Sequence, residues 1–296
     1  MSDIKYLAQP SCKRYYRKKR HKMLCKDQIE FFNAEGYLVV ENVVDQTDIL
    51  DPIRNEYEAL LNCLVGGWVE KKKISNRVLE LDFQDKLLTT YQAGLDWFQP
   101  FDISLPGDKI TVDTPMHFSS NTFNLLKCSQ ILDTVQCLIG PEITSNPIQH
   151  IRLKPPIKYL RGEECRAHIS KTDWHQDRGV TMDDADDTTM VTVWVAVTDA
   201  TLENGCLKVI PKSSTDKLLP HCAERQTCIA KGFISESESI PLPVKSGSII
   251  VIHPLTPHSS LENLSNEFRW SFDIRYNRSG EPTGRAHFPE FVARSK

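Results

Sequence analysis

The sequence predicts an α+β protein in which helices come first and a β-rich half follows. Up to about residue 141, apolar residues recur at helical spacing, whereas from about Glu142 short β-prone runs alternate with turn residues, as in a barrel or sandwich. The chain has 296 residues, 40% hydrophobic and 25% charged, which allows a sizeable core. We expect a basic arm over 1–23 and a single domain over 24–296, with helices over 24–141 and the β core over 142–296.

The expected helices have clear start and stop signals. Gly36 follows the first helix where a C-cap is wanted, and Gly140-Pro141 stops the last one. A β-rich run over 37–44 separates the first two helices. The predicted helices cover residues 25–35, 45–64, 85–98 and 124–139.

The β-rich half contains five expected strands, over residues 148–154, 189–198, 206–210, 248–253 and 269–276. Side chains alternate between the two faces of a strand, so Arg269 and Ser271 should point the same way in the last one. Its aromatic and aliphatic positions should then pack outward against the helices. The stretch 213–244 is long and poor in apolar residues, which predicts a lid over the substrate.

Composition excludes several classes of protein. The formal net charge of -3 gives no support for binding to nucleic acid or to an acidic membrane, and the longest apolar runs have the length of a strand. Nine Cys without a CxxC pair argue against a disulfide framework and for a reducing compartment. We therefore expect a small-molecule partner and, by default, a cytoplasmic location; the oligomeric state is left open. The basic run Lys13–Lys22 is interpreted as part of a solvated arm.

The candidate chemistry begins with the triplet His175-Gln176-Asp177. On an extended strand, His175 and Asp177 share a face and can reach one ion, although one such triplet alone is common by chance. A later strand ends at His258, and Arg269 follows eleven residues further on. Two His and one carboxylate leave three metal positions free, as in non-haem Fe(II) oxygenases. An Arg on the next strand offers a planar fork for a dicarboxylate.

Several motifs, taken together and in order, are similar to a known family. They are FFNAEGYLVVENVV near the start, KPP at 154–156, WHQD at 174–177, TVWVAVTDATLENGCLKVIPKS at 192–213, and HSSLEN at 258–263 with Arg269. With them the chain resembles the phytanoyl-CoA dioxygenase-like (PhyH) Fe(II)/2-oxoglutarate-dependent oxygenases, from Leu24 onward.

The resemblance implies a fold and a cofactor set. The fold would be a double-stranded β-helix, a cupin-like jelly-roll barrel flanked by the N-terminal helices. Fe(II), 2-oxoglutarate and O2 would oxidise an unactivated C–H bond, while 2-oxoglutarate loses CO2 to become succinate. Because a carboxylate occupies position 177, hydroxylation is favoured over halogenation.

The resemblance also assigns roles to residues. His175, Asp177 and His258 would bind iron, and Arg269 with Ser260 would hold the distal carboxylate of 2-oxoglutarate. Gln149 and Trp194 would also touch this co-substrate, although RGEEC at 161–165 looks like an insertion that blurs the alignment before the triplet. Near the substrate we expect Arg178, Lys171 and Ser271.

Alternatives stay open for single residues. His253 is a rival metal ligand, Arg269 could pair with Asp273, and Trp194 could be core filler. The acidic residues between 183 and 187 could form a second cation site, although such runs are more often solvated loops.

Alternatives also stay open for function. A biosynthetic tailoring oxygenase competes with a fatty acyl-CoA 2-hydroxylase, for which scattered basic residues including Arg275 and Arg278 are available. A non-catalytic metal-binding barrel and a zinc hydrolase are further alternatives, since two His and one Asp also suit zinc.

Overall fold

A computed structural model describes residue 10 and residues 23–107, 109–211, 217–224, 226–285 and 288–296. The basic run Lys13–Lys22 lies outside the described residues, as does the beginning of the predicted lid. Among the helices that are described, none combines the length and apolar character needed to cross a bilayer.

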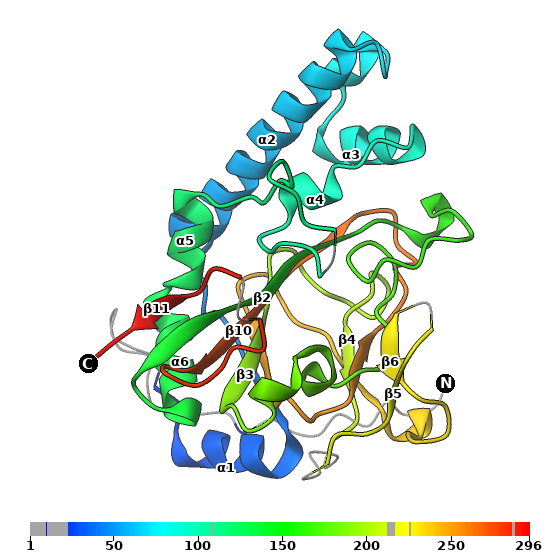
Figure 1. Cartoon of the computed structure of the whole chain (residues 1–296). Helices are drawn as coiled ribbons and strands as arrows, with labels where there is room; N and C mark the ends of the chain where they lie inside the picture. The colour runs from blue at the N-terminus through cyan, green and yellow to red at the C-terminus, as the bar shows by residue number, and fades with distance from the viewer. Residues whose placement is uncertain (1–9, 11–22, 108, 212–216, 225, 286–287) are drawn as a thin grey trace.

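The centre of the molecule is a six-stranded antiparallel sheet with the order β1-β8-β3-β10-β2-β11 (Figure 1). Its two longest strands, β2 and β10, lie side by side and come from opposite ends of the β-rich half. The order is not sequential, so distant segments meet on one surface. The strands are β1 (Tyr37–Val40), β2 (Ile143–Lys154), β3 (Met190–Ala196), β8 (Ile249–Ile252), β10 (Arg269–Arg278) and β11 (Phe291–Arg294).

Two smaller sheets accompany it. One is three-stranded with the order β7-β4-β9, and the other is the β5–β6 hairpin. The predicted lid is therefore not a structureless loop, because it contains the hairpin and β7. Their bounds are β4 (Leu207–Val209), β5 (His221–Ala223), β6 (Thr227–Ile229), β7 (Ile240–Leu242) and β9 (His258–Ser260).

The helices precede the sheets, as predicted, with three differences in their bounds. The predicted helix 85–98 already ends at Gln92, as α3, and a separate short helix begins at Phe98. The segment 45–64 begins with a π-helical turn over Gln46–Leu50 and continues as α2 to Glu70. The predicted helix 124–139 is two helices, because Cys128 adopts a non-helical ψ of 118°. The α-helices are α1 (Lys26–Glu35), α2 (Asp51–Glu70), α3 (Phe83–Gln92), α4 (Phe98–Phe101), α5 (Ser120–Leu126) and α6 (Ser129–Ile139). Gly36 ends α1 with a φ of 78°, a conformation that favours Gly.

The helices cover one face of the large sheet. Trp270 on β10 stacks on Phe83 at 5.9 Å between ring centroids, and Tyr57 of α2 lies edge-on to it at 5.4 Å. Tyr276 is fully buried and donates a hydrogen bond to the carbonyl of Leu126. These contacts confirm that the aromatic face of β10 packs against the helices.

The opposite face of the large sheet packs on the three-stranded sheet. Trp194 and Ala196 of β3 share a second core with Leu207 and Val209 of β4 and with Leu242 of β7. The fold is thus α+β, with antiparallel sheets in two layers and helices outside. Polar residues that point from β2 and β10 toward the three-stranded sheet lie between the layers, where a site can be shielded from water.

The pairing of β2 with β10 is irregular at one place. Asp273 lies opposite His150, but Arg275 lies opposite Asn146, so β2 carries extra residues around Pro147. Such bulges re-aim side chains and interrupt the ladder of hydrogen bonds. Here the carbonyl of Ile148 accepts a hydrogen bond from Arg275 instead.

Candidate active site

The structure brings His175, Asp177 and His258 together between the two layers. His258 begins β9, and the backbones of His175 and His258 exchange two hydrogen bonds of 3.0 Å each. This bridge holds the two imidazole rings with their centroids 4.2 Å apart. Asp177 follows at the start of a short 3₁₀ helix, Asp177–Val180, which turns its carboxylate back toward both rings.

Hydrogen bonds fix which nitrogen of each imidazole faces Asp177. Nδ1 of His175 donates to the carbonyl of Asp173 at 2.9 Å, and Nδ1 of His258 donates to that of Thr256 at 3.0 Å. Each Nε2 is then left with a lone pair. These Nε2 atoms lie 3.9 and 3.8 Å from the two carboxylate oxygens of Asp177, too far for a hydrogen bond but suitable for a shared ion.

The protonation states also suit metal binding. Burial, and then the neighbouring His258 ring, lower the pKa of His175 to about 3, so this imidazole is neutral at neutral pH. Burial alone would raise the pKa of Asp177, but the adjacent Arg275 guanidinium, together with His258, His175 and Thr192, outweighs burial and holds this pKa well below its usual value. The neutral imidazole of His175 and the carboxylate of Asp177 are therefore both in the forms that bind a metal.

A ferrous ion fits these residues. The three donor atoms lie within 4.8 Å of one another, and all three residues are buried. Oδ2 of Asp177 is buried without a hydrogen-bond partner in the described part of the chain, which is costly unless something binds it. One carboxylate and two imidazoles are the donor set of the non-haem iron oxygenases.

A cavity lies beside this group, lined by residues that include His175, His258 and Trp194, the three basic residues Arg152, Lys154 and Arg269, and one acidic residue, Asp273. Arg269 is 1% exposed, and its guanidinium lies over the ring of Trp194 at 5.3 Å. Its Nη1 donates to Ser271 at 2.6 Å, yet no carboxylate in the described chain pairs with it. Burial lowers the pKa of Arg269 to about 10, so it stays charged at neutral pH. A buried cation that forms no ion pair suits a carboxylate ligand.

Lys154 adds a second buried cation to this cavity. Its Nζ donates to Thr172 at 2.7 Å and to Ser260 at 2.8 Å, and no described carboxylate forms an ion pair with it. Burial, followed by the charges of Arg269 and Arg152, holds the pKa of Lys154 well below its usual value. An entering diacid would relieve this repulsion. The cavity itself measures about 10 Å³.

The other predicted co-substrate residues have different positions. Trp194 and the hydroxyl of Ser260 lie at the cavity, the latter through its bond to Lys154. Gln149 does not: it points from the other face of β2 and lines a separate small cavity with Phe288. Alternation along β2 explains this, because Arg152 and Lys154 occupy the inward positions. We therefore leave Gln149 out of the proposed site.

The three residues expected near the substrate also differ. Ser271 points inward and binds Arg269. Arg178 points away, because its guanidinium donates to the carbonyls of Ala185 and Thr188. Lys171 is exposed and lines an outer cavity together with Lys154 and Arg161.

Three of the rival assignments find no support, whereas Trp194 does pack in the second core as well as lining the cavity. His253 lies apart from the three donors, with its Nδ1 accepting a hydrogen bond from the backbone of Leu255. Asp273 pairs with Arg152 at 2.7 Å rather than with Arg269. The acidic residues of the 183–187 loop belong to neither group of potential metal ligands found among the described residues.

Sequence reasoning missed two residues of the site, Arg275 and the role of Lys154. Alternation along β10 predicts that Arg275 shares a face with Arg269, but its pairing with Asp177 is visible only in the structure. Lys154 was seen in the KPP motif, but a Lys in a strand gives no sign that it is buried. The β5–β6 hairpin was also missed; it lies against the triplet, where Nε2 of His221 accepts a hydrogen bond from the backbone of Gln176 at 3.1 Å.

Known proteins are similar to this chain over most of its length. The family model for phytanoyl-CoA dioxygenase (PhyH) matches residues 32–271. A phytanoyl-CoA dioxygenase of Arabidopsis thaliana is 24% identical over 269 residues, covering 85% of this chain and 88% of the relative. The human peroxisomal phytanoyl-CoA dioxygenase is 26% identical over 263 residues, covering 86% and 68%.

Solved structures share the fold. The non-haem monooxygenase ThoJ has a TM-score of 0.57 at 19% identity, covering 90% of this chain and 84% of that one. The epimerase SnoN, in complex with Fe3+, α-ketoglutarate and nogalamycin RO, has a TM-score of 0.54 at 20% identity, covering 87% and 86%. EvdO2 from Micromonospora carbonacea, complexed with 2-oxoglutarate, has a TM-score of 0.51 at 18% identity, covering 90% and 96%.

The fold and the site define a non-haem Fe(II)/2-oxoglutarate-dependent dioxygenase. Within that class, the chain belongs to the phytanoyl-CoA dioxygenase (PhyH) family. Membership of this class confirms the expected iron cofactor and 2-oxoglutarate co-substrate.

Proposed function

We propose that this protein hydroxylates an unactivated C–H bond of a small metabolite, with iron held by His175, Asp177 and His258. The observation that carries the proposal is how the three side chains face one another: Nε2 of His175 lies 3.9 Å from Oδ1 of Asp177, and Nε2 of His258 lies 3.8 Å from the buried Oδ2, which has no hydrogen-bond partner in the described chain. Bound iron with 2-oxoglutarate and O2 would supply the oxidation, with release of CO2 and succinate. The two-layered sheets would form the jelly-roll barrel that surrounds this chemistry.

Arg269 and Lys154 are proposed to hold the distal carboxylate of 2-oxoglutarate. They are the two buried cations beside the iron ligands that have no ion-pair partner in the described chain. Together they offer several charged N–H donors, which is what a carboxylate binds. Ser260 and Trp194 support them, the first by orienting Nζ of Lys154 and the second by packing under the guanidinium of Arg269.

Arg275 is proposed to position the aspartate ligand. Its Nη2 pairs with Oδ1 of Asp177 and its Nη1 donates to the carbonyl of Ile148 at 2.9 Å, so the carboxylate is held by a fixed fork. Oδ2 stays turned toward the imidazoles. The arrangement keeps Asp177 ionised and leaves the open metal positions to the co-substrate and O2.

There are two candidate substrate classes, an acyl-CoA and a small biosynthetic metabolite. The relatives named phytanoyl-CoA dioxygenase favour the acyl-CoA. We favour the other, a small metabolite modified in a biosynthetic pathway, because the cavity next to His175 measures about 350 Å³, too little for a whole coenzyme A thioester.

Succinate release tests the function. The purified protein with Fe(II), 2-oxoglutarate and O2 should release succinate, slowly without substrate and faster with a substrate from a metabolite extract. Zn(II) in place of Fe(II) should give none. Binding of metal without any succinate under these conditions would instead favour a non-catalytic metal-binding protein.

A further inference from the structure

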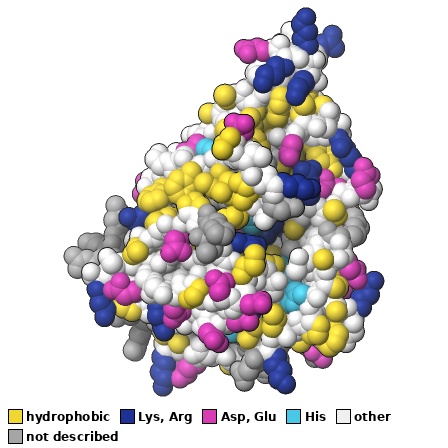
Figure 2. All heavy atoms as spheres, in the orientation of Figure 1, with side chains coloured by type: hydrophobic (Ala, Val, Ile, Leu, Met, Phe, Trp, Pro, Cys, Tyr) yellow, Lys and Arg dark blue, Asp and Glu magenta, His cyan; other side chains and the backbone are white. Residues whose placement is uncertain are grey.

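The cavity next to His175 has an unusual charge. It measures about 350 Å³, and Figure 2 shows a hollow over β2 on this face with Lys and Arg atoms at its floor. Among the described residues that line it there are four Arg and three His but no Asp or Glu: Arg152, Arg166, Arg275, Arg285, His150, His168 and His175. A cavity lined in this way favours an anion.

Three of the four arginines have an acidic partner outside the lining. Arg152 pairs with Asp273 at 2.7 Å, Arg166 with Glu164 at 2.9 Å, and Arg275 with Asp177. Their charges are therefore largely neutralised, and they shape the cavity more than they attract a ligand.

Arg285 is the exception. Its Nη2 donates to the carbonyl of Val180 at 3.2 Å and its guanidinium lies 5.9 Å from the ring of Phe288, but no carboxylate of the described chain pairs with it. Burial, and then the charge of Arg275, lower its pKa, as expected for a half-buried cation without an anion nearby. Arg285 is thus a free cationic donor on the wall of the cavity.

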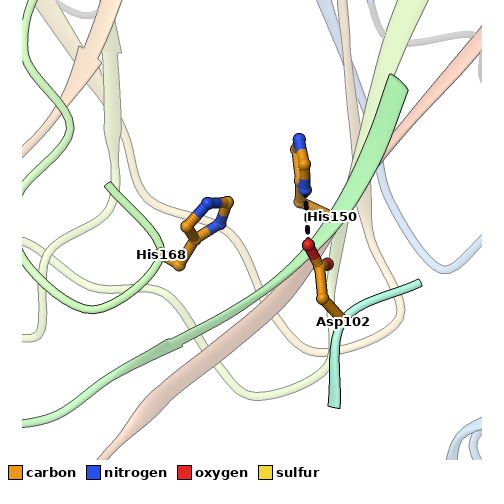
Figure 3. A group of neighbouring side chains, drawn as sticks. All are labelled: Asp102, His150 and His168. Atoms are coloured by element: carbon orange, nitrogen blue, oxygen red, sulfur yellow. Dashed lines mark hydrogen bonds and ion pairs between the residues drawn. The ribbon is translucent and has the colours of Figure 1, made fainter. Parts of the chain in front are cut away.

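Two imidazoles face the same space. Nδ1 of His150 donates to Oδ2 of Asp102 at 2.8 Å, so its Nε2 points away from this carboxylate (Figure 3). Nδ1 of His168 accepts a hydrogen bond from Arg152 at 2.9 Å, which places the proton of this ring on Nε2. The rings are 4.7 Å apart, and His168 stacks on Phe98.

These hydrogen bonds exclude the other use of the cluster. Asp102, His150 and His168 could hold a metal by the spacing of their donor atoms alone. However, the Nδ1 of His150 carries a proton for Asp102, and the Nδ1 of His168 faces the guanidinium of Arg152. A second cation would meet a positive charge at that position, so the cluster is suited to hydrogen bonding with a substrate.

We propose that the substrate carries a free carboxylate, which pairs with Arg285 while Nε2 of His168 donates a hydrogen bond to the same molecule. This inference rests on the proposed oxygenase function and specifies its substrate as a small organic acid. Because His175 lines the same cavity, the charged end fixes the distance between the anion and the C–H bond that reaches the iron. The phosphates of a coenzyme A ester would lie outside this cavity.

A small fluorinated anion tests the site without requiring turnover. The anaerobic protein is saturated with Fe(II) and 2-oxoglutarate, so that Arg269 is occupied, and trifluoroacetate binding is followed by ¹⁹F NMR against neutral trifluoroethanol. We expect wild type to prefer trifluoroacetate and Arg285→Gln to lose at least about tenfold in affinity for it. Arg285→Lys should keep part of the preference, and Arg278→Gln, an exposed arginine at the end of β10, should match wild type.

The outcomes separate the competing explanations. Equal binding of trifluoroacetate by wild type and Arg285→Gln, or no preference over trifluoroethanol, would overturn the proposal. Octanoate should displace trifluoroacetate from wild type; displacement by octanoyl-CoA alone would instead assign the anion to the ester's phosphates and refute a free carboxylate. If the wild-type protein releases no succinate, the oxygenase function fails while the anion site, measured by NMR, is judged separately.

Discussion

Two clusters in this molecule have the same composition, two His and one Asp, and different surroundings. In the first, both Nδ1 atoms of His175 and His258 donate to backbone carbonyls, and Asp177 forms no hydrogen bond with either ring. In the second, Asp102 is bonded directly to His150 (Figure 3). Only in the first cluster do both imidazoles turn a free ring nitrogen toward the carboxylate. Residue type and proximity therefore do not define a metal site; the partners of the remaining ring nitrogens do.

The largest effect is expected from the carboxylate of the first cluster. Asp177→Ala should remove nearly all bound iron and lower turnover by at least about a thousandfold, because the only anionic ligand is lost. Metal content by elemental analysis and succinate release measure both. Since this change leaves Arg275 buried and unpaired, His258→Ala is the companion variant and should also lose the metal.

The matched change in the second cluster is Asp102→Asn, which should leave the iron content as in wild type. Iron loss in Asp102→Asn, or full iron content in both variants of the first cluster, would contradict the comparison.

The next effect concerns the co-substrate. Arg269→Leu should raise the apparent KM for 2-oxoglutarate by at least about tenfold, because a buried charge pair is lost, while iron remains bound. Spectroscopic titration of the anaerobic Fe(II) protein with 2-oxoglutarate gives a second, turnover-independent reading. An unchanged requirement would place the carboxylate elsewhere, with Lys154 as the next candidate.

A smaller effect is expected on stability, from Lys154. Its pKa is low in the folded protein and about 10.4 when unfolded, so between these values the unfolded chain binds more protons. The free energy of unfolding should therefore rise with pH across this window, by up to about 1.4 kcal/mol per pH unit, and the penalty is fully present below the folded pKa.

Urea denaturation at several alkaline pH values, without 2-oxoglutarate, measures this slope in wild type and in Lys154→Met. The variant should lack the Lys154 contribution. Identical slopes would show that Lys154 is not a buried cation.

The smallest effect is expected at His253. His253→Ala should keep the iron content of wild type, because His253 is not part of the metal-ligand group. Its ring lies beside Phe32, with 6.2 Å between the ring centroids. Loss of iron would show that His253, rather than His258, is the ligand.

Much of this architecture could be predicted from residue patterns. Alternation along β10 correctly separated Arg269 and Ser271 from the aromatic positions. Successive side chains of a strand point to opposite faces even when both faces are buried. The helix ending at Gly36 and the strand leading to Lys154 were also predicted. Residue spacing paired His175 with Asp177, and the structure does bring them and His258 together. The pair is joined by a single bridge residue and the start of a 3₁₀ helix, however, and not by the extended strand that was expected.

Other features depend on contacts that no local pattern contains. The break at Cys128 and the β5–β6 hairpin are set by packing between distant segments, and strands of three residues carry too few positions to show a period. Gln149 was expected at the co-substrate by family resemblance, whereas the structure places it at a separate cavity beside Phe288. The Asp102–His150 pair joins a helix end to a strand 48 residues away, a proximity that only the fold creates.

The bulge in β2 has a consequence for how this protein could be altered. A regular ladder would contain more backbone bonds and would, by itself, be a firmer sheet. It would also use up the carbonyl of Ile148 and leave Arg275 with one anchor fewer. Selection or design for a regular sheet alone would therefore weaken the hold of Arg275 on Asp177. Residues 146–148 should be kept unchanged in any thermostable derivative of this protein.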